Sequence, residues 1–262
     1  MMEGLEIRGL EAGYGSRRIV NNLSLPCLPP GEVIALVGPN AAGKSTLMRS
    51  LAGLTPAQGE ARLDGDNLFA LSPTERAKRV SFMPQSLPSG IALNVFEGVF
   101  TALKAAPPSR MVSNTQLRRR AFSALEQFGI GDLALHPFDN LSGGQRQLAS
   151  LAQATVREPR LLLLDEPTSA LDLAHQIRAM RLVREYARRR EAIVVAILHD
   201  LSLACRWADR IAVLTKGDLI AFGQPEVAIT PQTLRLAYGI EARVEADDSG
   251  RLRIDIENVL PT

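Results

Sequence analysis

One segment near the amino terminus has the residue types needed to bind a phosphate chain. The run Gly38-Pro39-Asn40-Ala41-Ala42-Gly43-Lys44-Ser45 fits the pattern G-x-x-x-x-G-K-[ST] and lies between an apolar run and a stretch with helical character. Small residues let backbone N–H groups surround the phosphates, and a helix beginning near Gly43 would direct its positive end at them. Lys44 adds a charge, and Ser45 offers a hydroxyl to Mg²⁺. The segment therefore predicts a nucleoside-triphosphate site.

Two adjacent carboxylates, Asp165 and Glu166, directly follow the four leucines 161–164. They are expected at the carboxyl end of a buried strand, where open α/β sheets bind their ligands. Asp165 is predicted to hold Mg²⁺ together with Ser45, and Glu166 to accept a proton from, or orient, the water that attacks the γ-phosphate. The alternative is that either acid only caps the following loop.

A second segment with free N–H groups and small residues lies at 141–145, with the sequence Leu-Ser-Gly-Gly-Gln. It opens a predicted helix that runs to about residue 158, so it offers another cradle for an anion at a helix start. On its own the pentapeptide also fits a structural role, in which Ser142 is an N-cap and the glycines are loop residues.

The elements that must position these residues follow an α/β pattern. Alternating residues predict a hairpin, and nearly unbroken apolar runs predict strands that are buried on both faces. The expected strands are 4–10, 18–25, 32–37, 59–65, 80–83, 161–164, 193–198, 210–215 and 218–222. The expected helices of this part are 46–54, 73–78 after the cap Ser72, and 173–189, which crosses over between two parallel strands.

The character of the chain changes after Gln85, where apolar residues recur at helical spacing. Helices are predicted at 94–104 and 116–128, separated by a loop at Pro107-Pro108-Ser109, and again from Leu141. The predicted fold class is therefore α/β, with one domain at 1–225 that consists of a core at 1–85 and 159–225 and a helical insertion at about 86–158. A C-terminal appendage, 226–262, is predicted to hold a helix at 231–238 and strands at 242–246 and 252–256, whose Leu252, Ile254 and Ile256 should share a buried face.

Composition narrows the class of protein. The chain has 262 residues, 46% of them hydrophobic and 22% charged, with a formal net charge of +2, which is too small to argue for nucleic acid. None of the apolar runs approaches the roughly 20 residues needed to cross a bilayer. No export signal is visible at the amino terminus, and Cys27 and Cys205 are expected to be reduced and structural.

Taken together, these motifs resemble those of the ATP-binding cassette (ABC) ATPases. Six elements occur in the order and spacing of that family, namely 38–45, Gln85, 141–145, Asp165-Glu166, 169–172 and His199. The resemblance covers residues 5 to about 223. It implies a P-loop NTPase core, an antiparallel β subdomain and an inserted helical subdomain, with ATP and Mg²⁺ as the bound groups.

The resemblance also assigns roles to positions in this chain. Glu166, His199 and Gln85 match the catalytic residues of the family, and Gln85 joins Ser45 and Asp165 at the metal. Tyr14 matches the aromatic residue that stacks on adenine, although it could also be a packing residue of the hairpin. Asp172 matches an aspartate that communicates between two nucleotide sites. The residues implied in nucleotide binding are Tyr14, Gly38, Asn40, Gly43, Lys44, Ser45, Thr46, Ser142, Gly143, Gly144, Gln145 and Asp172.

Members of the family work as head-to-tail pairs, in which the 141–145 signature of one chain closes over the ATP of the other. Segments 198–210, 171–176, 229–231 and 238–242 resemble bacterial importer ATPases for ferric siderophores, haem and cobalamin. This implies a second copy of the chain, two transmembrane permease subunits, an indirect link to a substrate-binding protein, no nucleic acid, and a place on the cytoplasmic face of the plasma membrane.

Some features depart from the family and leave alternatives open. Ala41 stands where a glycine is usual, so the position either accepts a negative φ or is strained. The stretch 97–106 lacks the arginine, tyrosine and histidine that many siderophore members have, which weakens the choice of substrate. A soluble ABC ATPase of repair, translation or cofactor assembly is the other hypothesis; it is disfavoured because the chain has a single cassette and no long coiled coil. A nucleotide-regulated module without turnover conflicts with the presence of both Glu166 and His199.

Overall fold

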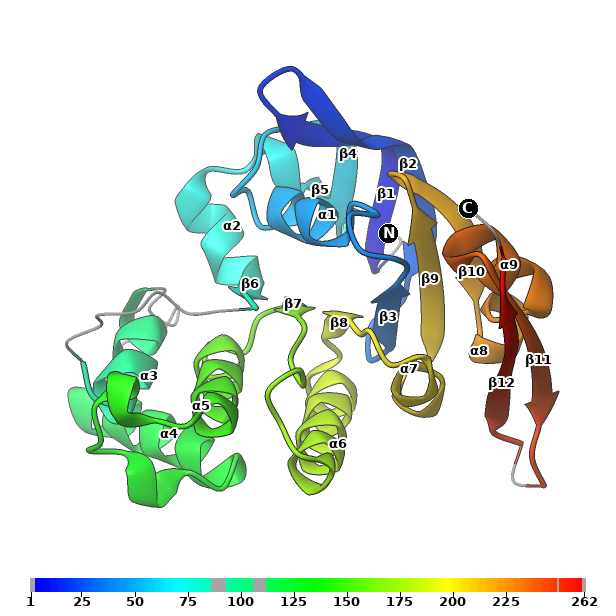
Figure 1. Ribbon diagram of the computed structural model, residues 1–262. Helices are drawn as coiled ribbons and strands as arrows, with labels where there is room; N and C mark the ends of the chain where they lie inside the picture. The colour runs from blue at the N-terminus through cyan, green and yellow to red at the C-terminus, as the bar shows by residue number, and fades with distance from the viewer. Residues whose placement is uncertain (1–2, 86–92, 106–111, 249, 261–262) are drawn as a thin grey trace.

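The computed structural model describes residues 3–85, 93–105, 112–248 and 250–260, and Figure 1 shows their arrangement. The strands are β1 Leu5–Tyr14, β2 Arg17–Leu28, β3 Val33–Val37, β4 Ala57–Leu63, β5 Asp66–Asn67, β6 Val80–Met83, β7 Leu161–Asp165, β8 Ile193–Ile197, β9 Arg210–Thr215, β10 Asp218–Gly223, β11 Ile240–Ala246 and β12 Leu252–Val259. The helices are α1 Lys44–Leu51, α2 Pro73–Arg79, α3 Val95–Ala105, α4 Asn114–Gln127, α5 Gly143–Thr155, α6 Leu173–Arg190, α7 Leu201–Trp207, α8 Pro225–Ala228 and α9 Pro231–Tyr238.

A six-stranded sheet with the order β10-β9-β3-β8-β7-β6 forms the centre of the molecule. The pairs from β9 to β6 are parallel, and only β10 is antiparallel to its neighbour. Parallel strands end at one edge of a sheet, so residues that follow β3, β8, β7 and β6 are brought together there. These are the phosphate loop, His199, Glu166 and Gln85, which is why residues far apart in the sequence can form one site.

The central strands are buried on both faces, as their apolar runs predict. Every residue of β3, β7 and β8 is buried. Val33, Ala35 and Val37 of β3 belong to the core cluster shared with the insertion helices, whereas Ile34 and Leu36 belong to the cluster shared with α1 and the antiparallel sheet. In Figure 1, α1 and the antiparallel sheet accordingly lie above the central sheet, and α3 to α7 lie below it.

The antiparallel sheet has the order β2-β1-β4-β5 and includes the predicted hairpin. The hairpin is longer than expected, because β1 continues to Tyr14 and pairs it with Arg17. Tyr14 is therefore the last residue of a strand and not a residue of the loop. The predicted helix start at Ser72 is confirmed, since its side chain accepts a hydrogen bond from the Glu75 backbone N–H and Pro73 takes the first helical position.

The helical insertion contains α3, α4 and α5, near the predicted positions. The loop predicted at 107–109 lies outside the described residues. The helix predicted to run to residue 158 was too long, because α5 ends at Thr155 and Glu158 has a left-handed φ of 56° that a helix cannot accommodate.

The C-terminal segment packs on the core through its helices. Leu234 and Ala237 of α9 and Ala228 of α8 are buried in the cluster that includes β9. Burial raises the pKa of the Tyr238 phenol to about 12, and a contact with the backbone of Gly38 partly opposes this rise. The appendage predicted at 226–262 is thus joined to the phosphate-loop side of the core.

Two features of this half differ from expectation, namely a pair of short helices and the exposure of the last strand. Helices α7 and α8 had no predicted counterpart, because each is at most seven residues long and shows little periodicity. The buried face predicted for the last strand was wrong, because Ile256 is 65% exposed and Leu252 and Ile254 are only half-buried. In the described part of the chain, no helix is long and apolar enough to span a bilayer.

Candidate nucleotide site

Two glycines of the phosphate loop are required by the backbone. Gly38 has a φ of 143°, and a Cβ there would lie 2.0 Å from the Leu214 carbonyl oxygen. Gly43 caps α1 in the left-handed region with a φ of 99°. Other residues rarely adopt such angles, so both positions exclude side chains and leave backbone N–H groups free to face a ligand. The helix that follows begins at Lys44, next to the start near Gly43 that the sequence predicts, and it ends at Leu51, before the expected end at 54.

Ala41 has a φ of 63°, which settles the alternative left open by the sequence in favour of strain. An L-residue in the left-handed region costs roughly 1–2 kcal/mol, because its Cβ crowds the backbone. The neighbouring Ala42 is buried at 2% exposure and has no such angle. The loop therefore stores strain at one residue beside the positions that are predicted to bind phosphate.

Replacing Ala41 by Gly is expected to stabilise the chain by up to about 1 kcal/mol, since relief of strain outweighs the larger entropy of glycine in the unfolded chain. The midpoint of thermal unfolding should rise by roughly 2–4 °C. Ala42→Gly is the matched control and should lower the midpoint, because it removes a buried methyl group without relieving strain. Equal destabilisation by both variants would show that Ala41 is not strained.

Lys44 lies inside the phosphate loop. Its ammonium group donates hydrogen bonds to the carbonyl oxygens of Gly38 at 2.7 Å and Pro39 at 2.8 Å, and the residue is 6% exposed. Burial lowers the pKa of Lys44, and the nearby carboxylates of Glu166 and Asp165 oppose that shift. The positive charge of Lys44 therefore lies where it would form an ion pair with a bound phosphate.

Ser45 and Asp165 meet as predicted from their positions after β3 and in β7. The Ser45 hydroxyl donates to Asp165 Oδ1 at 3.2 Å. Burial raises the pKa of the Asp165 carboxyl, and the hydrogen bond from Ser45 and the charge of Lys44 oppose this. One buried carboxylate and one hydroxyl are hard oxygen donors of the kind that Mg²⁺ uses together with phosphate oxygens and water.

Glu166 is the centre of a three-residue cluster. Gln85 Nε2 donates to Glu166 Oε2 at 2.7 Å, and His199 Nε2 lies 2.6 Å from Glu166 Oε1. Glu166 itself has a left-handed φ of 53°, a strained conformation of the kind that collects at functional sites. The structure thus brings together all three residues that were predicted to be catalytic. Gln85, predicted also at the metal, contacts Glu166 here.

Tyr14 ends strand β1 with half of its surface exposed, at 51%. The neighbouring hydroxyl of Thr55, which follows α1, contributes most to a lowered pKa of the Tyr14 phenol, and Thr46 and Arg49 act in the same direction. The ring therefore lies beside the helix that carries the phosphate loop. An exposed aromatic face at this place is suited to stacking on a base.

The signature residues do not join this cluster within one chain. Ser142 caps α5 in a capping box, where its hydroxyl accepts from the Gln145 N–H at 3.2 Å and the Gln145 side chain accepts from the Ser142 N–H at 3.0 Å. The structural role considered for Ser142 is therefore realised. Gly143 and Gly144 have no positive φ, so backbone conformation does not require glycine at either position.

Asp172 occupies a comparable position at the start of α6. Its carboxylate accepts from the His175 backbone N–H at 2.8 Å and lies 2.8 Å from His175 Nδ1. The hydrogen bond from the His175 backbone is the largest cause of the lowered pKa of Asp172. The residue is exposed, so it is available to another molecule.

Gln147 is a residue near the site that the sequence analysis missed. It lies on α5 with 6% exposure and hydrogen-bonds the segment that follows β7. A signal was present, because Gln147 is in phase with the buried residues Leu151 and Thr155 on one helix face, where a polar residue requires partners.

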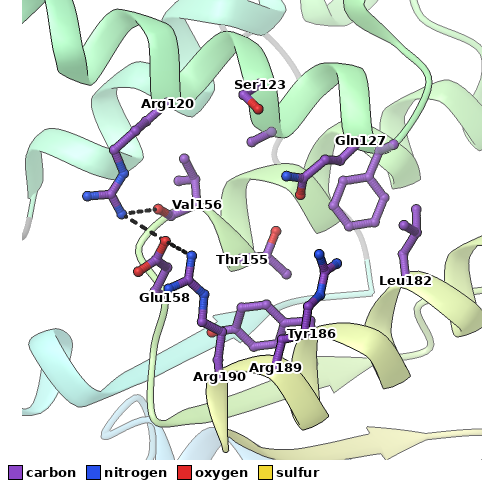
Figure 2. Close-up of a pocket in the computed structure, with 12 residues that line it drawn as sticks. Arg120, Ser123, Gln127, Thr155, Val156, Glu158, Leu182, Tyr186, Arg189 and Arg190 are labelled. Atoms are coloured by element: carbon purple, nitrogen blue, oxygen red, sulfur yellow. Dashed lines mark hydrogen bonds and ion pairs between the residues drawn. The ribbon is translucent and has the colours of Figure 1, made fainter.

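A separate cavity of about 500 Å³ lies between α4, the end of α5 and α6. Figure 2 shows Arg120 of α4 and Arg190 of α6 converging on the single carboxylate of Glu158, at 3.2 Å and 2.6 Å. Glu158 and Arg190 precede the amino ends of β7 and β8, so the cavity is at the opposite edge of the sheet from Glu166. Its ion pairs join the insertion to the core, and it does not form part of the nucleotide site.

Comparisons with known proteins agree with this geometry. The ABC transporter family matches residues 20–169. The hemin import ATP-binding protein HmuV of Gloeobacter violaceus is 38% identical over 248 residues, covering 92% of this chain and 89% of that protein. The ferric enterobactin transport ATP-binding protein FepC of Escherichia coli is 35% identical over 239 residues, covering 91% and 88%.

Solved structures show the same fold. A chain described as the inward-facing conformation of a metal-chelate type ABC transporter superposes with a TM-score of 0.80 at 26% identity, covering 98% of both chains. A dimeric ATP-binding cassette bound to ADP and phosphate superposes with a TM-score of 0.76 at 26% identity, covering 84% of this chain and 98% of that one. With its phosphate loop, the two acids at the end of β7 and the 141–145 signature in place, the chain belongs to the ABC transporter family and is an ATP-binding, ATP-hydrolysing cassette.

Proposed function

We propose that this cassette is the motor subunit of a bacterial importer and drives uptake of an iron complex, either a ferric siderophore or haem. The observation that carries the proposal is likeness over nearly the whole chain to HmuV and FepC, which are named for hemin import and ferric enterobactin transport. The match extends beyond the motifs common to all cassettes, because about nine-tenths of each chain is covered.

In this proposal Lys44, the loop N–H groups and Thr46 bind the phosphates of ATP, and Tyr14 stacks on its base. Ser45 and Asp165 fit a divalent cation, since they present two hard oxygens 3.2 Å apart beside the loop. Mg²⁺ bound there would neutralise charge on the phosphates. The other positions around Mg²⁺ would be filled by phosphate oxygens, by waters, of which Mg²⁺ usually keeps several, and by the Gln85 side chain that is also predicted at the metal.

Glu166 then orients the attacking water or accepts its proton. His199 and Gln85 hold the two carboxylate oxygens, so they fix the direction of the carboxylate that must face the water. When ATP binds, Gln85 and His199 can each replace the hydrogen bond to Glu166 by a new contact. The new partners would be the attacking water, the metal ion or the γ-phosphate. The left-handed backbone of Glu166 sets the carboxylate at the strand end.

The second half of each site comes from another copy of the chain. Ser142 to Gln145 lie at an exposed helix start whose N–H groups suit an anion. A two-fold pair uses the same surface on both chains and is self-limiting, which gives a dimer with two ATP molecules. Closure by ATP and reopening after hydrolysis would move two permease subunits at the cytoplasmic face of the plasma membrane, to which an external binding protein delivers the substrate.

Deleting the gene in its source bacterium is expected to abolish growth on haem or on a ferric siderophore as sole iron source. The wild-type chain supplied from a plasmid should restore growth, and the Glu166→Gln chain should not, because transport requires turnover. Growth on a soluble ferrous salt is the control and should be unchanged. Purification of the tagged chain from detergent-solubilised membranes should yield it together with the permease.

Two results would contradict the proposal at different levels. Normal use of both iron complexes together with lost uptake of cobalamin would leave an importer but correct its substrate. Normal uptake of all of these compounds, with no permease bound to the tagged chain, would favour a cassette that acts without a membrane partner.

A further inference from the structure

Gln147 is buried and uses both ends of its side-chain amide. Its Nε2 donates to the Glu166 carbonyl oxygen at 2.5 Å and to Ser169 Oγ at 3.3 Å, and its Oε1 accepts from the Ala170 N–H at 2.8 Å. All of these partners belong to the segment 166–170 that follows β7. One side chain of the signature helix α5 therefore makes three hydrogen bonds to this segment, two of them to its backbone and one to the Ser169 hydroxyl.

The segment 166–170 that Gln147 contacts begins with a strained backbone conformation at Glu166. Glu166 adopts a φ of 53°, which an L-residue maintains only where its surroundings fix it. Ser169 contributes, since its hydroxyl donates to the same Glu166 carbonyl at 3.2 Å. Gln85 and His199 contact the carboxylate end of Glu166, so Gln147 is the link from α5 to the backbone end.

The signature glycines lie against the same segment. A Cβ on Gly144 would be 3.2 Å from the Ala170 carbonyl oxygen, and a Cβ on Gly143 would be 3.4 Å from the Ala170 Cβ. The start of α5 thus touches Ala170 directly, and one turn later Gln147 binds its N–H. A displacement of the helix start is therefore passed to the 166–170 segment through packing and hydrogen bonds together.

We propose that Gln147 is a positioning residue that makes the signature helix, the backbone of Glu166 and the turn leading to Asp172 move as one unit. The inference rests on the proposed dimer, in which the signature contacts the partner's ATP. In that dimer, arrival of the partner's nucleotide on 142–144 aligns Glu166 for hydrolysis of the ATP on the chain's own phosphate loop. Gln147 touches neither nucleotide, and it acts through Glu166.

The test compares Gln147→Met and Gln147→Glu with Gln153→Met on the same helix. Met keeps the length of the side chain and removes its hydrogen bonds, and Glu keeps the acceptor for Ala170 but cannot donate to Glu166. Both Gln147 variants should lower kcat about tenfold or more, because a small misplacement of a catalytic group is costly. KM for ATP should change less than about twofold, since the phosphate loop is untouched. Gln153→Met should match the parent.

Two further measurements separate positioning from general loss of structure. In the Glu166→Gln background, Gln147→Met should still give the ATP-trapped dimer, which shows that folding, ATP binding and the signature survive. Amide hydrogen exchange in 166–172 should become faster in Gln147→Met, while exchange in β3 and α1 stays at the parent rate.

The inference is overturned if both Gln147 variants keep the parent kcat, or if kcat falls only together with loss of the trapped dimer and faster exchange throughout the chain. Failure of the dimer that the proposed function includes gives a different result, because Glu166→Gln alone would then form no ATP-dependent dimer. A parent chain that forms the dimer, with Gln147 variants of normal kcat, would remove this inference alone.

Discussion

Replacing Glu166 by Gln is expected to lower the rate of ATP hydrolysis by at least about 100-fold, the usual effect of losing a general base. Gln keeps the size of the side chain and can still contact Gln85 and His199, so the fold and ATP binding should survive. ATP affinity measured by fluorescence titration should stay within about threefold of the parent, because Lys44 and the loop N–H groups provide most of the binding. Steady-state phosphate release gives the rate.

Glu75→Gln is the matched control for this variant. Glu75 is exposed in the first turn of α2 and pairs with Lys78, away from the site. Its replacement should leave hydrolysis unchanged. Hydrolysis by Glu166→Gln near the parent rate would mean that another group activates the water, and the catalytic role of the cluster around Glu166 would be wrong.

Replacing Lys44 by Ala should remove both binding and turnover. A charge-assisted contact to a buried phosphate is worth roughly 2–3 kcal/mol, which corresponds to about 30- to 150-fold in affinity. The same charge stabilises the transferring phosphoryl group, so hydrolysis should fall by at least a further factor of about 100. Equilibrium binding of a fluorescent ATP analogue and phosphate release measure the two effects separately.

The variant also removes two internal hydrogen bonds of the phosphate loop, those from Lys44 to Gly38 and Pro39. Thermal unfolding without nucleotide should therefore be recorded, and Lys44→Met, which keeps most of the buried volume, provides a second variant. Lys78→Ala is the control on an exposed lysine. If Lys44→Met bound ATP as tightly as the parent, the 38–45 segment would not be the phosphate site.

The sequence predicts the site well where geometry follows from strand order. Gln85, Glu166 and His199 each follow an apolar run, and parallel buried strands must end at one edge of the sheet. Their approach within hydrogen-bond distance was therefore foreseeable. The same holds for Ser45 and Asp165, which follow from a phosphate loop and a second strand with an acid at its end.

Other features depend on tertiary contacts that no local pattern reports. The sign of φ at Ala41 is decided by the path of the whole loop, and the left-handed Glu158, three residues beyond the end of α5, is joined to Arg120 and Arg190 from two helices. The alternation of apolar and polar residues around Leu252, Ile254 and Ile256 indicates that these three residues share one face of the strand. That face is buried only if another element packs on it. At Ile256 the described chain supplies too little cover.

The central claim is that each ATP is enclosed by two chains, and the structure of the Glu166→Gln chain loaded with ATP and Mg²⁺ tests it most directly. We expect a dimer of twice the 28.4 kDa chain mass. Its γ-phosphate should contact Lys44 of one chain and Ser142 of the partner subunit. A lone chain with a fully closed nucleotide pocket, and with Ser142 still bonded only within its capping box to Gln145, would contradict the account.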